Sequence, residues 1–272
     1  MSPAGPEPAL RHVLVAFDLS PHSLAALEAA ASLAARAGGE LAGLFVEDEA
    51  FLRLAGLPAA RFVDARSAAV RPHDVATMER ELRHRADGAR HAIEQVAQRA
   101  RVRWTFRVVR GPVSPAVLAE AVGADLVALG RTGHEAYAGR RLGSTARAIS
   151  ASAAAPVLLL RRGETLASPI LVAYDGSEAA DRALDLALRL TGRDPIEVLL
   201  VGGGPDEPAS RRRAEARCAA RGVTARCRRV EARDLADAVR RERGGLLLLP
   251  AAPGSALVDR IEEFPCPVLR VR

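Results

Sequence analysis

Short apolar runs alternate along the chain with longer segments of helical periodicity. The first run, residues 12–17, is nearly continuous and β-branched, as expected for a strand that is buried on both faces of a parallel sheet. Ser20 and Pro21 then predict the start of a helix, whose apolar residues recur at helical spacing over 24–34. The opening pattern is therefore a strand, an acidic turn at Asp18 and a helix.

The same alternation continues as far as residue 160. Segment 47–74 loses clear periodicity, so we expect a long irregular connection there. Strand and helix in regular succession predict a doubly wound parallel sheet with helices on both faces. Further strands are predicted at 41–46, 102–109, 124–129 and 156–160, with helices at 75–101, 114–122 and 145–154.

The passage that begins at Pro169 repeats the passage that begins at His12, nearly residue for residue in type. The chain is therefore an internal duplication. Residues 161–167 form the linker, so the expected domains are 1–163 and 164–272. In the second copy, strands are predicted at 196–201, 223–230, 246–249 and 267–271, and helices at 209–221, 234–241 and 256–263.

The composition excludes several chemistries. Aromatic residues make up only 3% of the chain, so the core must be aliphatic. All 39 basic side chains are arginine, which excludes a P-loop lysine or a Schiff base. The net charge of +6 is spread over both copies without a clustered basic face, so we expect no nucleic-acid partner.

Cysteine and histidine usage indicates neither disulfides nor metal. The three cysteines are odd in number and form no CxxC pair, which favours reduced thiols in a cytoplasmic protein. The six histidines form no HxH or HxxxH pattern, so no metal site is expected. No apolar run approaches the roughly 18 residues of a membrane span, so we expect no membrane association.

A glycine-rich stretch connects the fourth predicted strand to the next helix. Residues 130–144 read GRTGHEAYAGRRLGS, with Gly130 and Gly133 at the start and Gly143 and Ser144 at the end. Glycine lets backbone N–H groups come close to a ligand, and a helix start favours an anion. The stretch predicts a phosphate-binding loop; the alternative is an ordinary glycine-rich turn with a capping serine.

Three separate segments end at the same edge of the predicted sheet. Asp18, Val46 and Gly130 each follow a strand, and ligands of such sheets bind beyond the carboxyl ends of the strands. Asp18 could accept hydrogen bonds from a nucleotide or simply stabilise the dipole of the following helix. Arg131, with Arg140 and Arg141, could neutralise phosphates, although arginine is common throughout this chain.

Three motifs together resemble the universal stress protein family: LVAFDLS, GxxGx9GS and the strand APVLLL. The resemblance covers nearly the whole chain and implies a domain that is present twice. The implied fold is two tandem doubly wound (Rossmann-like) five-stranded parallel sheets, each of strand order 3-2-1-4-5. Family members with G-x2-G-x9-G-(S/T) bind ATP, and Gly130, Gly133, Gly143 and Ser144 match that motif.

The resemblance also implies an adenosine pocket and a role. Asp18 and Val46 would line the pocket, with Leu129 beside the first glycine and Thr145 after the serine. The implied protein is a cytoplasmic stress-response regulator that binds ATP, with or without Mg²⁺. The alternative is an interaction scaffold or chaperone-like module that does not depend on nucleotide. With no strong catalyst in the sequence, we expect at most slow ATP hydrolysis.

The second copy departs from the motif. Residues 246–250 are followed by AAPGSA, so only Gly254 and Ser255 remain of the glycine pattern. We therefore expect one nucleotide per chain. The family also implies packing between fifth strands, either within this chain as a pseudo-dimer or in a homodimer.

Overall fold

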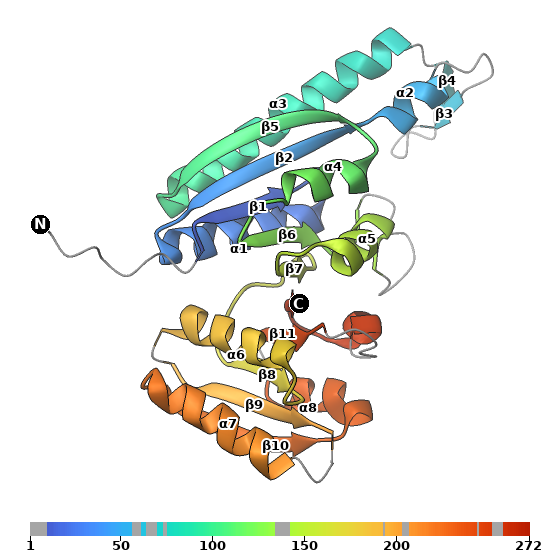
Figure 1. Ribbon diagram of the computed structural model, residues 1–272. Coiled ribbons are helices and arrows are strands. Elements are labelled where there is room, and N and C mark those ends of the chain that lie inside the picture. The colour runs from blue at the N-terminus through green and yellow to red at the C-terminus, as the bar shows by residue number, and fades with distance from the viewer. Residues whose placement is uncertain are drawn as a thin grey trace, which may run out of the picture.

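The computed structural model shows two α/β halves joined end to end (Figure 1). We call the part that carries strands β1 to β7 the first half and the part that carries β8 to β12 the second half. The structure describes residues 10–55, 61–63, 70–72, 75–133, 142–192, 194–202, 207–243, 245–251 and 258–272.

In the first half, five parallel strands form a sheet in the order β5-β2-β1-β6-β7. These strands are β1 (His12–Ala16), β2 (Glu40–Asp48), β5 (Arg103–Gly111), β6 (Leu126–Gly130) and β7 (Val157–Leu160). The helices that connect them are α1 (Pro21–Ala37), α3 (Val75–Ala100), α4 (Val113–Glu120) and α5 (Ser144–Ser152).

The second half repeats this order as β10-β9-β8-β11-β12. Counted along the chain, both halves read 3-2-1-4-5, so the predicted fold class is confirmed. The strands are β8 (Ile170–Tyr174), β9 (Ile196–Val201), β10 (Ala225–Val230), β11 (Leu246–Pro250) and β12 (Val268–Val271). The helices are α6 (Glu178–Thr191), α7 (Glu207–Ala220) and α8 (Leu235–Arg241), with 3-10 segments η1 (Ala232–Asp234) and η2 (Val258–Glu263).

The two halves share one continuous sheet. Strand β12 pairs antiparallel with β7, with Leu269 opposite Leu158, and this pairing creates a ten-stranded sheet. These are the fifth strands of the two halves, so the packing that the family resemblance implied is made within a single chain.

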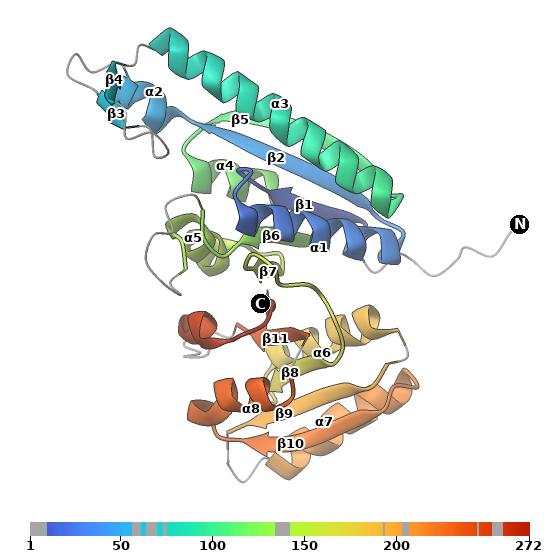
Figure 2. The ribbon, with the colours of Figure 1, turned by 180° about the vertical axis from the view of Figure 1, so that it is seen from behind.

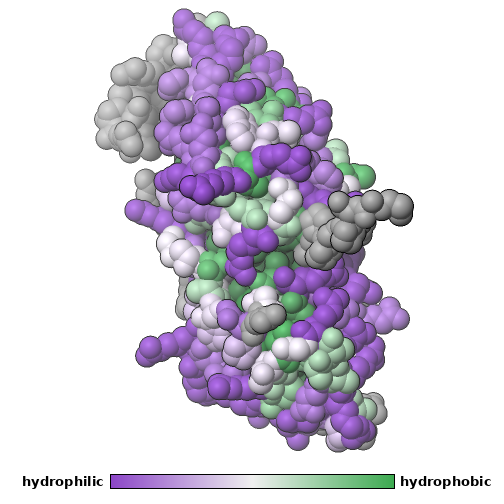
Figure 3. Space-filling view, turned by 90° about the vertical axis from the view of Figure 1, so that its left-hand side faces the viewer, coloured by the Kyte–Doolittle hydropathy of each residue, from purple (hydrophilic) through white to green (hydrophobic). Residues whose placement is uncertain are grey.

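Helices cover both faces of the sheet. Residues of α1, α3, α6 and α7 pack into one core cluster, while those of α4, α5 and α8 pack into the other (Figures 1 and 2). Leucine, valine and alanine dominate both clusters, as the low aromatic content predicts. One side of the molecule is mostly hydrophilic, with hydrophobic residues in a narrow strip along its middle (Figure 3).

The turn after the first strand of each half has the same backbone. Ser20 caps α1 by accepting from the Ser23 N–H at 3.2 Å, as predicted, and Ser177 caps α6 in the same way. The residue before each cap is left-handed: Leu19 has φ 66° and Gly176 has φ 80°. A left-handed leucine is uncommon, so the first half adopts this turn against a local steric cost.

Two predictions about elements are corrected. Segment 47–74 is not irregular throughout: β2 extends to Asp48, α2 (Glu49–Ala55) follows, and β3 (Arg61–Val63) pairs antiparallel with β4 (Val70–Pro72). The short apolar runs of these elements gave no clear period. The helix predicted at 256–263 is a 3-10 segment over its described part. Within the described residues, no helix is both long and apolar enough to cross a membrane.

Candidate functional site

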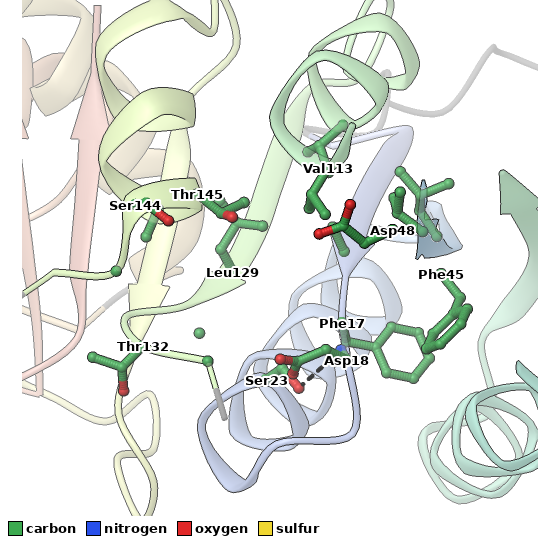
Figure 4. Close-up of a pocket in the computed structure, with 18 of the residues that line it drawn as sticks. Phe17, Asp18, Ser23, Phe45, Asp48, Val113, Leu129, Thr132, Ser144 and Thr145 are labelled. Atoms are coloured by element: carbon green, nitrogen blue, oxygen red, sulfur yellow. Dashed lines mark hydrogen bonds between the residues drawn. The ribbon is translucent and has the colours of Figure 1, made fainter. Parts of the chain in front are cut away.

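A cavity of about 520 Å³ opens at the carboxyl ends of β1, β2 and β6 and at the start of α5 (Figure 4). Its volume is in the range of small-ligand pockets. All nine residues that the sequence predicted for a nucleotide site line this cavity, although their binding role stays a prediction. They are Asp18, Val46, Leu129, Gly130, Arg131, Gly133, Gly143, Ser144 and Thr145.

The three glycines differ in how closely they are packed. A Cβ on Gly130 would lie 2.8 Å from the backbone nitrogen of Ser23, so the fold needs glycine where β6 passes the start of α1. A Cβ on Gly133 would lie 3.2 Å from Asp18 Oδ2. At Gly143 the nearest atom, the carbonyl oxygen of Arg131, would be 3.4 Å away, an ordinary contact. Gly143 is therefore the glycine that packing requires least.

Backbone groups dominate the glycine-loop side of the cavity. The Gly143 N–H donates to the carbonyl oxygen of Arg131 at 2.7 Å, which draws the two described ends of the loop together. Helix α5 begins at Ser144, and the first-turn amides of Ser144, Thr145 and Ala146 have no partner within the helix. Because this turn contains no acidic residue, the exposed amides and the helix dipole favour an anion.

Asp18 holds the turn and also faces the loop. Its Oδ1 accepts from the Ser20 N–H at 3.0 Å, and its own N–H donates to Ser23 Oγ at 3.3 Å (Figure 4). Its Oδ2 lies on the side of Gly133. Asp18 thus stabilises the turn at the start of α1, and its contact with a nucleotide stays a prediction.

Apolar side chains form the opposite part of the cavity. Figure 4 places Phe17, Phe45 and Asp48 across from Ser144 and Thr145. Sequence reasoning missed several lining residues, although the strand-end rule could have indicated the two phenylalanines next to Asp18 and Val46. The missed residues that line the cavity include Phe17, Phe45, Asp48, Arg85, Val113, Val117 and Thr132.

Two charged residues, Asp48 and Arg85, are among the missed residues that line the cavity. Arg85 enters from α3, a helix that the sequence analysis did not connect with the site. Thr132 Oγ1 is buried without a hydrogen-bond partner among the described residues. Because this oxygen is shielded from solvent, it does not face the open cavity.

The sequence analysis offered the Arg131 side chain as a group that could neutralise phosphates, and the structure places it elsewhere. Its guanidinium is only 1% exposed and donates to the carbonyl oxygens of Ile261, Phe264 and Cys266 in the second half. Burial lowers the pKa of Arg131 to about 10. The side chain therefore joins the halves, and only the backbone of Arg131 remains beside the glycine loop. Arg140 and Arg141 lie outside the described residues.

The corresponding cavity of the second half is smaller, about 220 Å³. Tyr174, the counterpart of Phe17, donates its hydroxyl to Asp181 Oδ1 at 2.6 Å. Asp181 also pairs with Arg213 and Arg217 of α7, so ion pairs occupy this side of the half. Pro250 ends β11 at the position where Gly130 ends β6. Residues 252–257, which include Gly254 and Ser255, lie outside the described residues.

Other chemistry is sparse in the described part of the chain. There, no group of three or more histidine, cysteine or acidic residues is arranged to hold a metal ion. His22, next to Gly130, accepts from the Arg162 N–H through Nδ1 at 2.9 Å. Burial lowers the pKa of His22.

Comparison with known proteins places the chain in a family. A model of the universal stress protein family matches residues 9–161, and no curated protein matches the sequence. A universal stress protein from Archaeoglobus fulgidus DSM 4304 has a similar structure, with TM-score 0.72, 18% identity and 95% coverage of each chain. A functionally unknown protein from Pseudomonas aeruginosa PAO1 gives TM-score 0.63 and 13% identity, covering 97% of this chain and 93% of that chain. These structures show the fold of both halves, and the family model matches more than half of the sequence: the chain belongs to the universal stress protein family.

Proposed function

We propose that the first half binds ATP in the cavity described above and that the chain is a cytoplasmic, nucleotide-responsive regulator of the stress response. One observation carries the proposal: strand ends far apart in the sequence meet the amide-rich start of α5 around one cavity of about 520 Å³. A triphosphate would lie at the glycine-loop side, where the α5 amides and the Ser144 and Thr145 hydroxyls can donate hydrogen bonds.

The opposite side suits an adenosine. Val46 and Val113 supply apolar contacts there and Phe17 supplies an aromatic one, while Leu129 adds an apolar contact beside Thr145. The Asp18 and Asp48 carboxylates, drawn across from the α5 hydroxyls in Figure 4, can accept hydrogen bonds from a ribose or an amino group. Mg²⁺ would be held mainly by the phosphates, because this cation commonly uses only one or two protein carboxylates.

The test is a titration of gel-filtered protein with ATP, ADP, adenosine and GTP by calorimetry, with and without Mg²⁺. We expect ATP to bind at one site per chain and more tightly than adenosine or GTP. Extraction of the purified protein and assay for adenine nucleotide provides a second readout. A nucleotide-free protein that shows no ATP affinity at millimolar concentration would end the proposal.

Gly143 offers the cleanest variant. Because a Cβ there meets only ordinary contacts, Gly143→Val should fold and yet narrow the loop beside Gly133. We expect its ATP affinity to fall at least tenfold, because the added side chain would displace the phosphate from its backbone hydrogen-bond donors. The matched control is Gly254→Val at the corresponding glycine of the second half, which should bind ATP like the wild type. Equal binding by both variants would show that the loop does not hold phosphate.

A further inference from the structure

One short segment of the second half contacts both described ends of the glycine loop. Residues 261–266 include the last residues of η2 and part of the turn that leads to β12. At the beginning of the loop, this segment accepts the three hydrogen bonds of the Arg131 guanidinium. At the end of the loop, Glu262 Oε1 accepts from the Leu142 N–H at 2.9 Å and from Arg147 Nη2 at 2.9 Å.

A further hydrogen bond, from the end of β7, holds this segment against the first half. Arg161, which directly follows β7, donates to the carbonyl oxygen of Glu262 at 2.8 Å. Arg161 follows β7, and residues 261–266 precede β12. Because β7 and β12 pair with each other, this segment lies beside the strands that join the two halves. The position of the Glu262 carboxylate is therefore set by the junction between the halves.

The hydrogen bond from the Leu142 N–H to Glu262 lies next to the candidate site. Leu142 precedes Gly143, whose N–H donates to the carbonyl oxygen of Arg131, and α5 starts one residue later. Leu142, Gly143 and Ser144 all line the cavity. Because backbone donors must be aimed closely to bind a phosphate, a small shift of this turn would misplace them.

We propose that Glu262 is a positioning residue for the nucleotide site: through its carboxylate, the second half holds the start of α5 and the end of the glycine loop in the shape that receives the phosphates. Glu262 does not contact the nucleotide. The affinity of the first half for ATP thus depends on its junction with the second half. By linkage, bound ATP stabilises that junction to the same extent. This proposal rests on the proposed function, because it describes how the same site is controlled.

Two variants of Glu262 separate positioning from charge. Glutamine keeps an oxygen that can accept from the Leu142 N–H, whereas alanine keeps none. We expect Glu262→Ala to weaken ATP binding about tenfold, the effect of losing a hydrogen bond to a charged group, and Glu262→Gln to stay within about twofold of the wild type. Adenosine affinity should not change in either variant, since the base side of the cavity is not involved.

The matched control is Glu263→Ala. Glu263 has the same charge and lies in the same segment, but its carboxylate pairs with Arg260 at 2.6 Å. Its ATP affinity should equal that of the wild type. Unchanged ATP binding in Glu262→Ala would overturn the proposal, and so would tighter binding in both Glu262 variants, which would mean that the carboxylate repels phosphate. An equal loss for ATP and adenosine would also overturn it, because that result indicates general loosening.

Hydrogen exchange of the nucleotide-free protein keeps the proposal testable if the wild type fails to bind ATP. We expect the backbone amides of 142–147 to exchange faster in Glu262→Ala than in the wild type or in Glu263→Ala. Faster exchange without any ATP binding in the wild type would refute the proposed function alone. Unchanged exchange would refute the positioning role of Glu262, whatever the ligand.

Discussion

The two halves of this chain share strand order and the turn after the first strand, yet the cavity described in the first half has more than twice the volume of the one described in the second. In the first half, the sheet edge combines Phe17, Asp18 and a glycine-lined loop around about 520 Å³. In the second half, Tyr174 and Asp181 are tied to arginines of α7, and the cavity shrinks to about 220 Å³. The fold supplies a crevice at the same sheet edge in both halves, but the residues that line it differ.

The same comparison explains the two kinds of residue that end the fourth strands. Gly130 passes so close to the start of α1 that a side chain has no room. Pro250 ends β11 at the equivalent place in the second half. The halves therefore differ in the residue that ends the fourth strand, which is glycine where the glycine loop begins and proline in the second half.

The largest expected effect comes from Gly130→Val. Because its side chain would meet backbone atoms of Ser23 and His22 at about 3 Å or less, we expect a loss of about 3 kcal/mol in the free energy of unfolding. ATP binding should be abolished as well. Urea denaturation measures the first effect and calorimetry the second. Gly143→Ala, with ordinary contacts only, should cost less than about 1 kcal/mol; a similar cost for both variants would contradict this account of packing.

The ion pairs of the second half should contribute stability without affecting the ligand. Asp181 is buried, and Asp181→Ala would remove the acceptor of the Tyr174 hydroxyl and the ion pair with Arg213, while Arg217 would keep its pair with Asp185. We expect a loss of about 2 kcal/mol, reduced from the value for a fully buried pair because the arginines are partly exposed. Thermal unfolding tests this, and the ATP affinity should remain at the wild-type value. A change in ATP affinity would mean that the α7 network also shapes the first half.

Substitutions of Asp18 and of its counterpart Asp175 test whether the aspartate after the first strand contributes to ATP binding in the first half alone. Asp18→Asn keeps an oxygen for the Ser20 N–H, so the cap survives while the charge is lost. We expect ATP affinity to fall about tenfold, which equals about 1.4 kcal/mol, whereas Asp175→Asn should leave it unchanged. Calorimetric titration of both variants decides the matter. If the two behave alike, Asp18 serves the helix start only.

The smallest expected effect concerns pH. His22 has no titratable counterpart in the second half, where Ala179 takes its place. Burial lowers the pKa of His22 in the folded state, so the unfolded chain binds the proton more readily. The stabilisation is therefore present above the ordinary pKa of 6.5 and is lost as pH falls through the lowered folded value. Between pH 7.5 and 5.5, unfolding midpoints should fall less for His22→Ala than for the wild type.

Sequence alone determined the features that depend on local chemistry. Strand and helix periods, the Ser20 cap and the internal repeat follow from residues that are neighbours along the chain, and the family motif added the strand order. The nine predicted site residues meet at one cavity because parallel strands present their carboxyl ends at the same edge. Segment 47–74 was predicted less well, because its short elements carry too few residues to show a period.

Only the tertiary structure decided how the halves meet and what their side chains do there. No local pattern could assign Arg131 to carbonyl oxygens 130 or more residues away, or Glu262 to the Leu142 N–H. Nor could it show that two arginines of α7 would pair with Asp181 of α6. These partners are brought together by the β7–β12 pairing and by helix packing across the sheet, which join residues that the sequence keeps far apart.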